Sequence, residues 1–124
     1  TIKDGSGLSD FNSVSPKYLA QFSKLVLSGV GNYAVIYQGL PIANESGSLS
    51  SRFNKDNLDA AGKIIAKTGW IKRGYTLAGI IKSKDGVDLV FAVYAHGQVD
   101  DTTKLAIDNF VTAVYRCGNQ LSNN

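Results

Sequence analysis

The chain has 124 residues, of which 44% are hydrophobic and 19% charged, a composition typical of one folded domain large enough to bury a core. Its apolar runs fall well short of the roughly 18 residues that a membrane span needs. The net charge of +3 is only mildly basic, and cations such as Lys72, Arg73, Lys82 and Lys84 lack the stacking aromatic neighbours of a nucleic-acid surface, which argues against a nucleic-acid partner.

The first element that the sequence predicts is a helix that starts after Ser15. Residues Thr1–Ser15 are polar and rich in Gly and Ser, so they are expected to form a loop. Ser15 suits the N-cap and Pro16 the first helical position, while Gly29 and Gly31 are expected to end the helix. Apolar residues at helical spacing predict core packing, and they are Tyr18, Leu19, Phe22, Leu25 and Val26.

The next segments give weaker signals. Residues Asn32–Gln38 are compatible with either a short helix or a short strand. Residues Gly39–Asn57 contain Gly, Pro, Ser and Asn throughout without a sustained period, so we expect mostly loop, anchored by Arg52-Phe53.

The stretch Ala61–Leu77 carries the strongest functional signal. Two isoleucines in Lys63–Ala66 favour a strand packed on both faces. At Lys67-Thr68-Gly69 the apolar run gives way to a cation, a hydroxyl and a glycine, and glycine inside a strand often marks the close approach of a ligand or a second backbone. This pattern indicates a cleft at an exposed strand edge that can take an extended peptide by strand addition. A strand followed by a polar hairpin turn explains the same residues equally well.

The remaining elements complete an antiparallel arrangement. A second strand is predicted over about Gly74–Lys82, a hairpin turn at Lys84-Asp85-Gly86 and a third strand over Val87–Ala95. A closing helix is expected from about Asp100 to Tyr115, capped by Asp101 or Thr102 and stopped by Gly118, with a frayed tail over Gln120–Asn124. The fold class is therefore α+β, with helices packed on an antiparallel sheet.

Several motifs occur together in a familiar order. Lys-Thr-Gly is one of the sequence motifs of β-lactamases and penicillin-binding proteins. Upstream of it stand Asp4-Gly5-Ser6-Gly7-Leu8-Ser9 and then Gly47-Ser48-Leu49 followed by Arg52-Phe53, and Leu77-Ala78-Gly79-Ile80 follows it. From about Asp4 to Cys117 the chain resembles the C-terminal part of the D-alanyl-D-alanine carboxypeptidases/endopeptidases among the class C, low-molecular-mass penicillin-binding proteins. The resemblance implies the C-terminal part of a β-lactamase/transpeptidase-like fold.

Two motifs of that family are missing from this chain. No serine is followed three positions later by lysine, so Ser-x-x-Lys is absent. The one Ser-x-Asn is Ser122-Asn123-Asn124, in the expected tail, where no cleft could hold it. The chain begins with Thr1 and not with methionine, so we expect an excised or processed piece of a longer protein. Residues 1–124 are therefore expected to be a C-terminal segment that supplies one wall of the active site.

By resemblance, the catalytic residues of this wall are Lys67, Thr68, Gly69 and Trp70. Lys67 would place positive charge beside the serine of the missing Ser-x-Asn motif and toward the terminal carboxylate of the substrate. Thr68 would hydrogen-bond that carboxylate, and the backbone N–H of Trp70 would be one of two oxyanion donors. Many relatives carry a second threonine where Trp70 stands, so one hydroxyl is lost from the carboxylate site.

Other polar residues have weaker claims. By resemblance, the loop of Ser6, Gly7 and Leu8 borders the substrate side-chain pocket, although a plain turn explains it equally well. Some relatives carry arginine where Asp10 stands. We interpret His96 as a surface or capping residue. We interpret Asp100-Asp101 as a charge pair favoured by the helix dipole.

The resemblance implies a serine D-alanyl-D-alanine carboxypeptidase that forms an acyl-enzyme on cell-wall peptides. Its expected partners are a peptidoglycan stem peptide ending in D-Ala-D-Ala, β-lactams and the N-terminal part of the same protein. No cofactor or metal is expected. Cys117 has neither a disulfide partner in the chain nor metal-ligand spacing around it. The resemblance to the family implies an extracytoplasmic location. The alternatives are a non-catalytic module that binds wall peptide, and an unrelated α+β domain in which Lys-Thr-Gly is coincidence.

Overall fold

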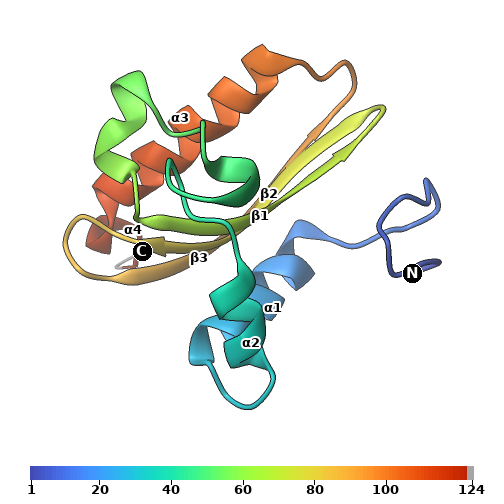
Figure 1. Cartoon of the computed structure of the whole chain (residues 1–124), viewed down its shortest axis with the longest axis horizontal. Helices are drawn as coiled ribbons and strands as arrows, with labels where there is room; N and C mark the ends of the chain where they lie inside the picture. The colour runs from blue at the N-terminus through green and yellow to red at the C-terminus, as the bar shows by residue number, and fades with distance from the viewer. Residues whose placement is uncertain (123–124) are drawn as a thin grey trace.

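The computed structural model describes residues 1–122 and shows helices on both faces of a three-stranded antiparallel sheet (Figure 1). The strands are β1 (Ile64–Ile71), β2 (Gly74–Lys82) and β3 (Asp88–His96), in the order β1-β2-β3. Helix α3 (Asp101–Cys117) covers one face, and α1 (Pro16–Ser28) and α2 (Tyr33–Gly39) lie on the other. Two 3₁₀ helices, η1 (Gly47–Leu49) and η2 (Lys55–Ala60), lie in the connection between α2 and β1. The predicted α+β class is confirmed.

The strand register leaves β1 at the edge of the sheet. Its pairing with β2 runs without a break from Ile64↔Ile81 to Ile71↔Gly74, and β2 pairs with β3 along its whole length. The second predicted strand has the predicted bounds, and the third begins and ends one residue later than expected. Because β1 has a partner strand on one side only, the backbone groups on its other side are free unless a loop segment pairs with them.

The core lies between the sheet and α3. Strand residues of one face are fully or almost fully buried there, together with residues of the loop and of α3, and the central members are Ile64, Ala66, Leu77, Ile81, Phe91, Leu49, Phe53 and Val111. Each apolar side chain of this size removed from water contributes about 1.5–3 kcal/mol. This packing fixes the position of β1, because Ile64 and Ala66 are completely buried.

Helix α1 begins as predicted and packs less fully than predicted. The Ser15 side chain accepts the N–H of Tyr18, Pro16 is the first helical residue, and Gly29 ends the helix at φ 65°. Val26 is buried, whereas Tyr18 and Leu25 are exposed, so the apolar stripe contacts the sheet along only part of its length. The ambiguous segment that follows is the helix α2.

Helix α3 corrects the predicted N-cap. Its N-cap is Asp100, not Asp101 or Thr102, and the Asp100 carboxylate accepts the backbone N–H groups of Thr102 and Thr103. The hydroxyl of Thr102 and these backbone donors lower the pKa of Asp100 below its ordinary value. Asp101 lies in the first helical turn, as expected for charge that favours the helix dipole.

The segment after α3 is helical rather than frayed. Gly118 ends α3 as predicted, but α4 (Asn119–Ser122) follows it. The carboxylate of Asp85, in the β2–β3 turn, accepts the backbone N–H of Asn119 (2.7 Å) and holds this segment against the sheet. The rest of the predicted tail, Asn123 and Asn124, lies outside the described residues. Within residues 1–122 no helix is both long and apolar enough to cross a bilayer.

The segment 39–57 is anchored by the residues that the sequence singled out. Phe53 is 1% exposed, and the guanidinium of Arg52 bonds both carboxylate oxygens of Asp108 on α3 (2.6 and 3.3 Å). The same guanidinium lies 5.5 Å from the ring centre of Tyr75. This buried ion pair ties the loop that carries η1 to the core.

Candidate functional site at the free edge of β1

The edge of β1 is covered at one end and free at the other. Ala43 donates its N–H to the carbonyl of Ile64 (2.9 Å), and Ala66 donates its N–H to the carbonyl of Pro41 (3.0 Å). In an antiparallel pair the backbone groups of successive residues point alternately toward and away from the partner strand. The N–H and C=O groups of Thr68 and Trp70 therefore also point outward, and no backbone group of residues 1–122 pairs with them. This stretch is open to an added strand.

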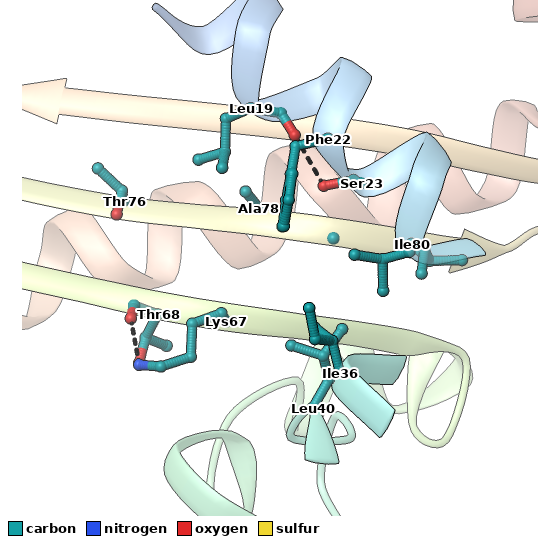
Figure 2. A pocket seen from close by; sticks show the side chains of 12 residues that line it. Leu19, Phe22, Ser23, Ile36, Leu40, Lys67, Thr68, Thr76, Ala78 and Ile80 are labelled. Atoms are coloured by element: carbon teal, nitrogen blue, oxygen red, sulfur yellow. Dashed lines mark hydrogen bonds between the residues drawn. The ribbon is translucent and has the colours of Figure 1, made fainter. Parts of the chain in front are cut away.

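Lys67 and Thr68 stand where the covered edge gives way to the free edge. The exposed Lys67 ammonium curls back and donates to the carbonyl oxygen of Thr68 (2.7 Å), as Figure 2 shows. The Thr68 hydroxyl lies on the opposite face and donates to the hydroxyl of Ser48 on η1 (2.9 Å). A cation and two hydroxyls thus gather around the outward-pointing backbone of Thr68.

A cavity of about 320 Å³ opens beside Lys67, between the sheet and the two N-terminal helices. Figure 2 shows Leu19 and Phe22 of α1 and Ile36 of α2 facing Ala78 and Ile80 of β2 across it. Lys67, Thr68 and Thr76 contribute the polar atoms at one end. The lysine therefore borders a groove, as an active-site wall requires, and most of that groove is apolar.

Gly69 has a packing reason in addition to the expected approach of a ligand. It pairs with Thr76 across the β1–β2 ladder. A Cβ atom at position 69 would overlap the Thr76 hydroxyl. A residue larger than glycine would therefore force the Thr76 side chain to move at the end of the cavity.

Trp70 lies on the opposite face from Lys67. Its side chain is 70% exposed, and Tyr75 is its direct partner across the ladder. The two aromatic residues line a second, smaller cavity of about 190 Å³ together with the start of α3, including Lys104. The Trp70 indole does not line the cavity beside Lys67, whereas its backbone N–H points out of the free edge.

The structure does not bring the Ser6-Gly7-Leu8 loop to this cavity. The Asp4 carboxylate organises the loop by accepting the N–H of Gly7 (3.0 Å) and the hydroxyl of Ser6 (3.1 Å). All three loop residues are exposed and none lines the cavity beside Lys67. Figure 1 places this N-terminal loop beyond the first turn of α1, away from β1. A substrate-pocket role for Ser6, Gly7 and Leu8 stays a prediction.

One site residue was not singled out by sequence reasoning, namely Ser48. The stretch Gly47-Ser48-Leu49 was part of the resemblance, but nothing in the sequence places Ser48 beside Thr68, twenty positions away. His96 is exposed at the end of β3, which agrees with a surface residue. Among residues 1–122 no three acidic, histidine or cysteine side chains cluster as metal ligands.

Comparison with known proteins identifies the family to which this fold and strand edge belong. The chain belongs to the D-Ala-D-Ala carboxypeptidase 3 (S13) family, whose profile matches residues 1–115. An unrelated α+β domain is therefore the wrong interpretation.

Individual relatives agree with the family. The chain is 30% identical over 109 residues to the D-alanyl-D-alanine carboxypeptidase DacB of Haemophilus influenzae. The aligned region covers 85% of this chain and 22% of that relative. It is 42% identical over 82 residues to the penicillin-sensitive carboxypeptidase A of Dictyostelium discoideum, covering 65% of this chain and 15% of the relative. The chain thus spans less than a quarter of the length of these relatives.

Solved structures share the fold. Penicillin binding protein 4 (dacB) from Haemophilus influenzae superimposes with a TM-score of 0.81 at 25% identity, over 94% of this chain and 27% of that one. A predatory endopeptidase from Bdellovibrio bacteriovorus, solved with its immunity protein, superimposes with a TM-score of 0.63 over 93% of this chain and 32% of that one. At 24% identity this second likeness shows the fold alone.

Proposed function

We propose that this chain is the C-terminal segment of a serine D-alanyl-D-alanine carboxypeptidase and forms one wall of its active site. The observation that carries the proposal is the free edge at Thr68 and Trp70, beside the Lys67 ammonium and a cavity, in a member of the S13 family. A second segment of the same protein, carrying Ser-x-x-Lys and Ser-x-Asn, supplies the nucleophile.

The substrate lies along this edge as an added strand. A peptide backbone antiparallel to β1 exchanges hydrogen bonds with the outward N–H and C=O groups of Thr68 or Trp70. The Lys67 ammonium must leave the Thr68 carbonyl to let a peptide N–H take its place, and it then turns toward the nucleophile and the terminal carboxylate. Strand addition thus positions the scissile carbonyl and frees the catalytic cation in one event.

The reaction proceeds in two steps. The serine hydroxyl oxygen attacks the carbonyl carbon of the penultimate D-alanine, and the Trp70 N–H stabilises the oxyanion that forms. The C–N bond breaks, the amine of the terminal D-alanine takes up a proton, and an ester remains on the serine. Water then attacks the ester, releases the shortened peptide and gives one of its protons to the serine oxygen. A β-lactam forms an ester on the same serine when its ring amide opens, and the amine that is released stays attached to the acyl group.

The proposed partners follow from this chemistry. They are stem peptides ending in D-Ala-D-Ala, β-lactams and the N-terminal part of the same protein, and the proposed location is extracytoplasmic. The name of the Dictyostelium relative, a penicillin-sensitive carboxypeptidase, supports β-lactams as ligands of this protein.

Fluorescent penicillin tests the proposal. The full-length protein should carry a covalent label that survives denaturation, and it should release D-alanine from a peptide ending in D-Ala-D-Ala. If the protein binds the peptide without labelling or cleavage, it is the alternative, a non-catalytic module that binds wall peptide at the edge of β1.

A further inference from the structure

The indole of Trp70 is a large apolar surface beside the free edge of β1. It is 70% exposed, and the backbone N–H of the same residue points out of that edge. The indole also lines the second cavity, of about 190 Å³, at the start of α3. Trp70 therefore belongs to both features, because its backbone meets an added strand and its side chain meets the groups that this strand turns toward α3.

The lining of the second cavity favours an apolar group. Its charged side chains already have partners: the Lys104 ammonium lies 3.3 Å from the Asp101 carboxylate, and the Asp100 carboxylate accepts backbone N–H groups of α3. The aromatic and aliphatic side chains of the lining therefore remain for a ligand, and they are Trp70, Tyr75 and Val99.

The strand partner of Trp70 is held in place. Tyr75 pairs with Trp70 across the ladder and is only 7% exposed. Its ring centre lies 5.5 Å from the Arg52 guanidinium and 5.4 Å from the Lys104 ammonium. A surface built on groups that hold each other in this way needs little ordering when a ligand binds.

The register of the proposed substrate brings its last residue beside Trp70. The penultimate D-alanine pairs with Trp70, and an antiparallel strand runs its carboxyl end toward Thr68, so the terminal residue lies beside Gly69. An L-residue at this place would point to the face opposite Trp70, because successive side chains of a strand alternate. In a D-residue the side chain and the hydrogen on Cα exchange places. The side chain of the terminal D-residue therefore turns toward the face that carries the indole.

We propose that Trp70 is a specificity-determining residue whose indole packs against the side chain of the terminal D-residue and favours an apolar residue larger than D-alanine. This inference rests on the proposed function and breaks the same amide bond, so the released amine belongs to an apolar D-amino acid such as D-leucine. The exposed indole and the second cavity next to it provide the apolar surface that such a side chain covers.

The test uses two peptides that differ only in their last residue, one ending in D-Ala-D-Ala and the other in D-Ala-D-Leu. The measured quantity is kcat/KM of the full-length protein for release of the terminal amino acid. The wild type should prefer the peptide ending in D-leucine about fivefold, as partial burial of the extra carbon atoms predicts. Trp70→Thr should reduce this preference to less than about twofold. Both rate constants come from the same preparation, so their ratio does not depend on the fraction of folded protein.

Two variants control for other effects of the substitution. Trp70→Phe keeps an aromatic ring and should retain most of the preference. Phe110→Thr removes an exposed aromatic side chain of α3 that lines neither cavity, and it should keep the ratio of the wild type. A wild type without preference for D-leucine, or an unchanged ratio in Trp70→Thr, would overturn the role of Trp70 alone. A wild type that releases neither D-alanine nor D-leucine would instead overturn the proposed function, and this inference with it.

Discussion

Replacing Asp108 with alanine leaves the guanidinium of Arg52 buried without its carboxylate. The two side chains are only 9% and 7% exposed and are joined by hydrogen bonds of 2.6 and 3.3 Å. The Asp108 carboxylate also accepts the backbone N–H of Phe53 (3.4 Å). Breaking a buried pair on one side costs about 3–5 kcal/mol, because the remaining charge stays out of water.

This loss is a large fraction of the stability expected for a single domain, about 5–15 kcal/mol. For 124 residues the unfolding entropy near Tm converts each kcal/mol into about 4 °C, so Asp108→Ala should lower Tm by about 15 °C. Urea unfolding followed by circular dichroism measures the free energy directly.

The double variant Arg52→Met/Asp108→Leu provides the matched control. One guanidinium nitrogen of Arg52, Nη1, is buried without a hydrogen-bond partner in the described part of the chain, so the pair is incompletely satisfied. Apolar side chains of similar volume should therefore recover most of the stability that Asp108→Ala loses. A loss below about 1 kcal/mol in Asp108→Ala, or a double variant as unstable as the sum of Arg52→Met and Asp108→Leu, would refute this reasoning.

Three further predictions concern the rest of the fold. Gly79→Ala places a Cβ atom against the backbone of β1 and should lower the free energy of unfolding in urea by about 1–3 kcal/mol. At Gly39 an added Cβ atom meets no atom within 4 Å, so Gly39→Ala should change that free energy by less than about 1 kcal/mol. Equal effects of the two substitutions would contradict this packing. Because the pKa of Asp100 is lowered in the folded state, the ionised Asp100 stabilises the fold fully above its ordinary pKa, and this stabilisation is lost as pH falls through the lowered pKa. The free energy of unfolding should therefore decline below about pH 4, and less steeply in Asp100→Asn than in the wild type. The same pH dependence in both proteins would exclude this contribution. Trp70, the one tryptophan of the chain, should be quenched readily by acrylamide in this chain, and strong protection would show that the edge of β1 is covered.

The sequence predicted the elements whose signals are strong and local. The second strand, from Gly74 to Lys82, has the expected bounds because apolar residues and turn residues define both of its ends. Ser15 caps α1 as expected, since a serine before proline is a specific helix start. At α3, however, consecutive residues from Asp100 onward can each act as a cap, and only the backbone geometry shows that Asp100 does so.

The contacts that build the candidate site are not local, and for this reason the sequence could not supply them. Arg52 and Asp108 are 56 positions apart, and Ser48 and Thr68 are 20 apart. The Lys-Thr-Gly motif identified the strand but not its outward-facing positions, which depend on the register with β2 and on the coverage by Pro41. The helical segment after Gly118 was missed because it depends on a carboxylate in a distant turn.

The most direct test of the proposed active-site wall is the acylation rate of full-length protein carrying Lys67→Ala. Lys63→Ala is the matched control, because Lys63 is an exposed lysine just before β1 and lines neither cavity. With fluorescent penicillin, Lys67→Ala should lower the second-order rate constant about a hundredfold, as removal of a preorganised positive group does, while Lys63→Ala should match the wild type. Equal rate constants for the Lys67→Ala variant and the wild type would contradict the account.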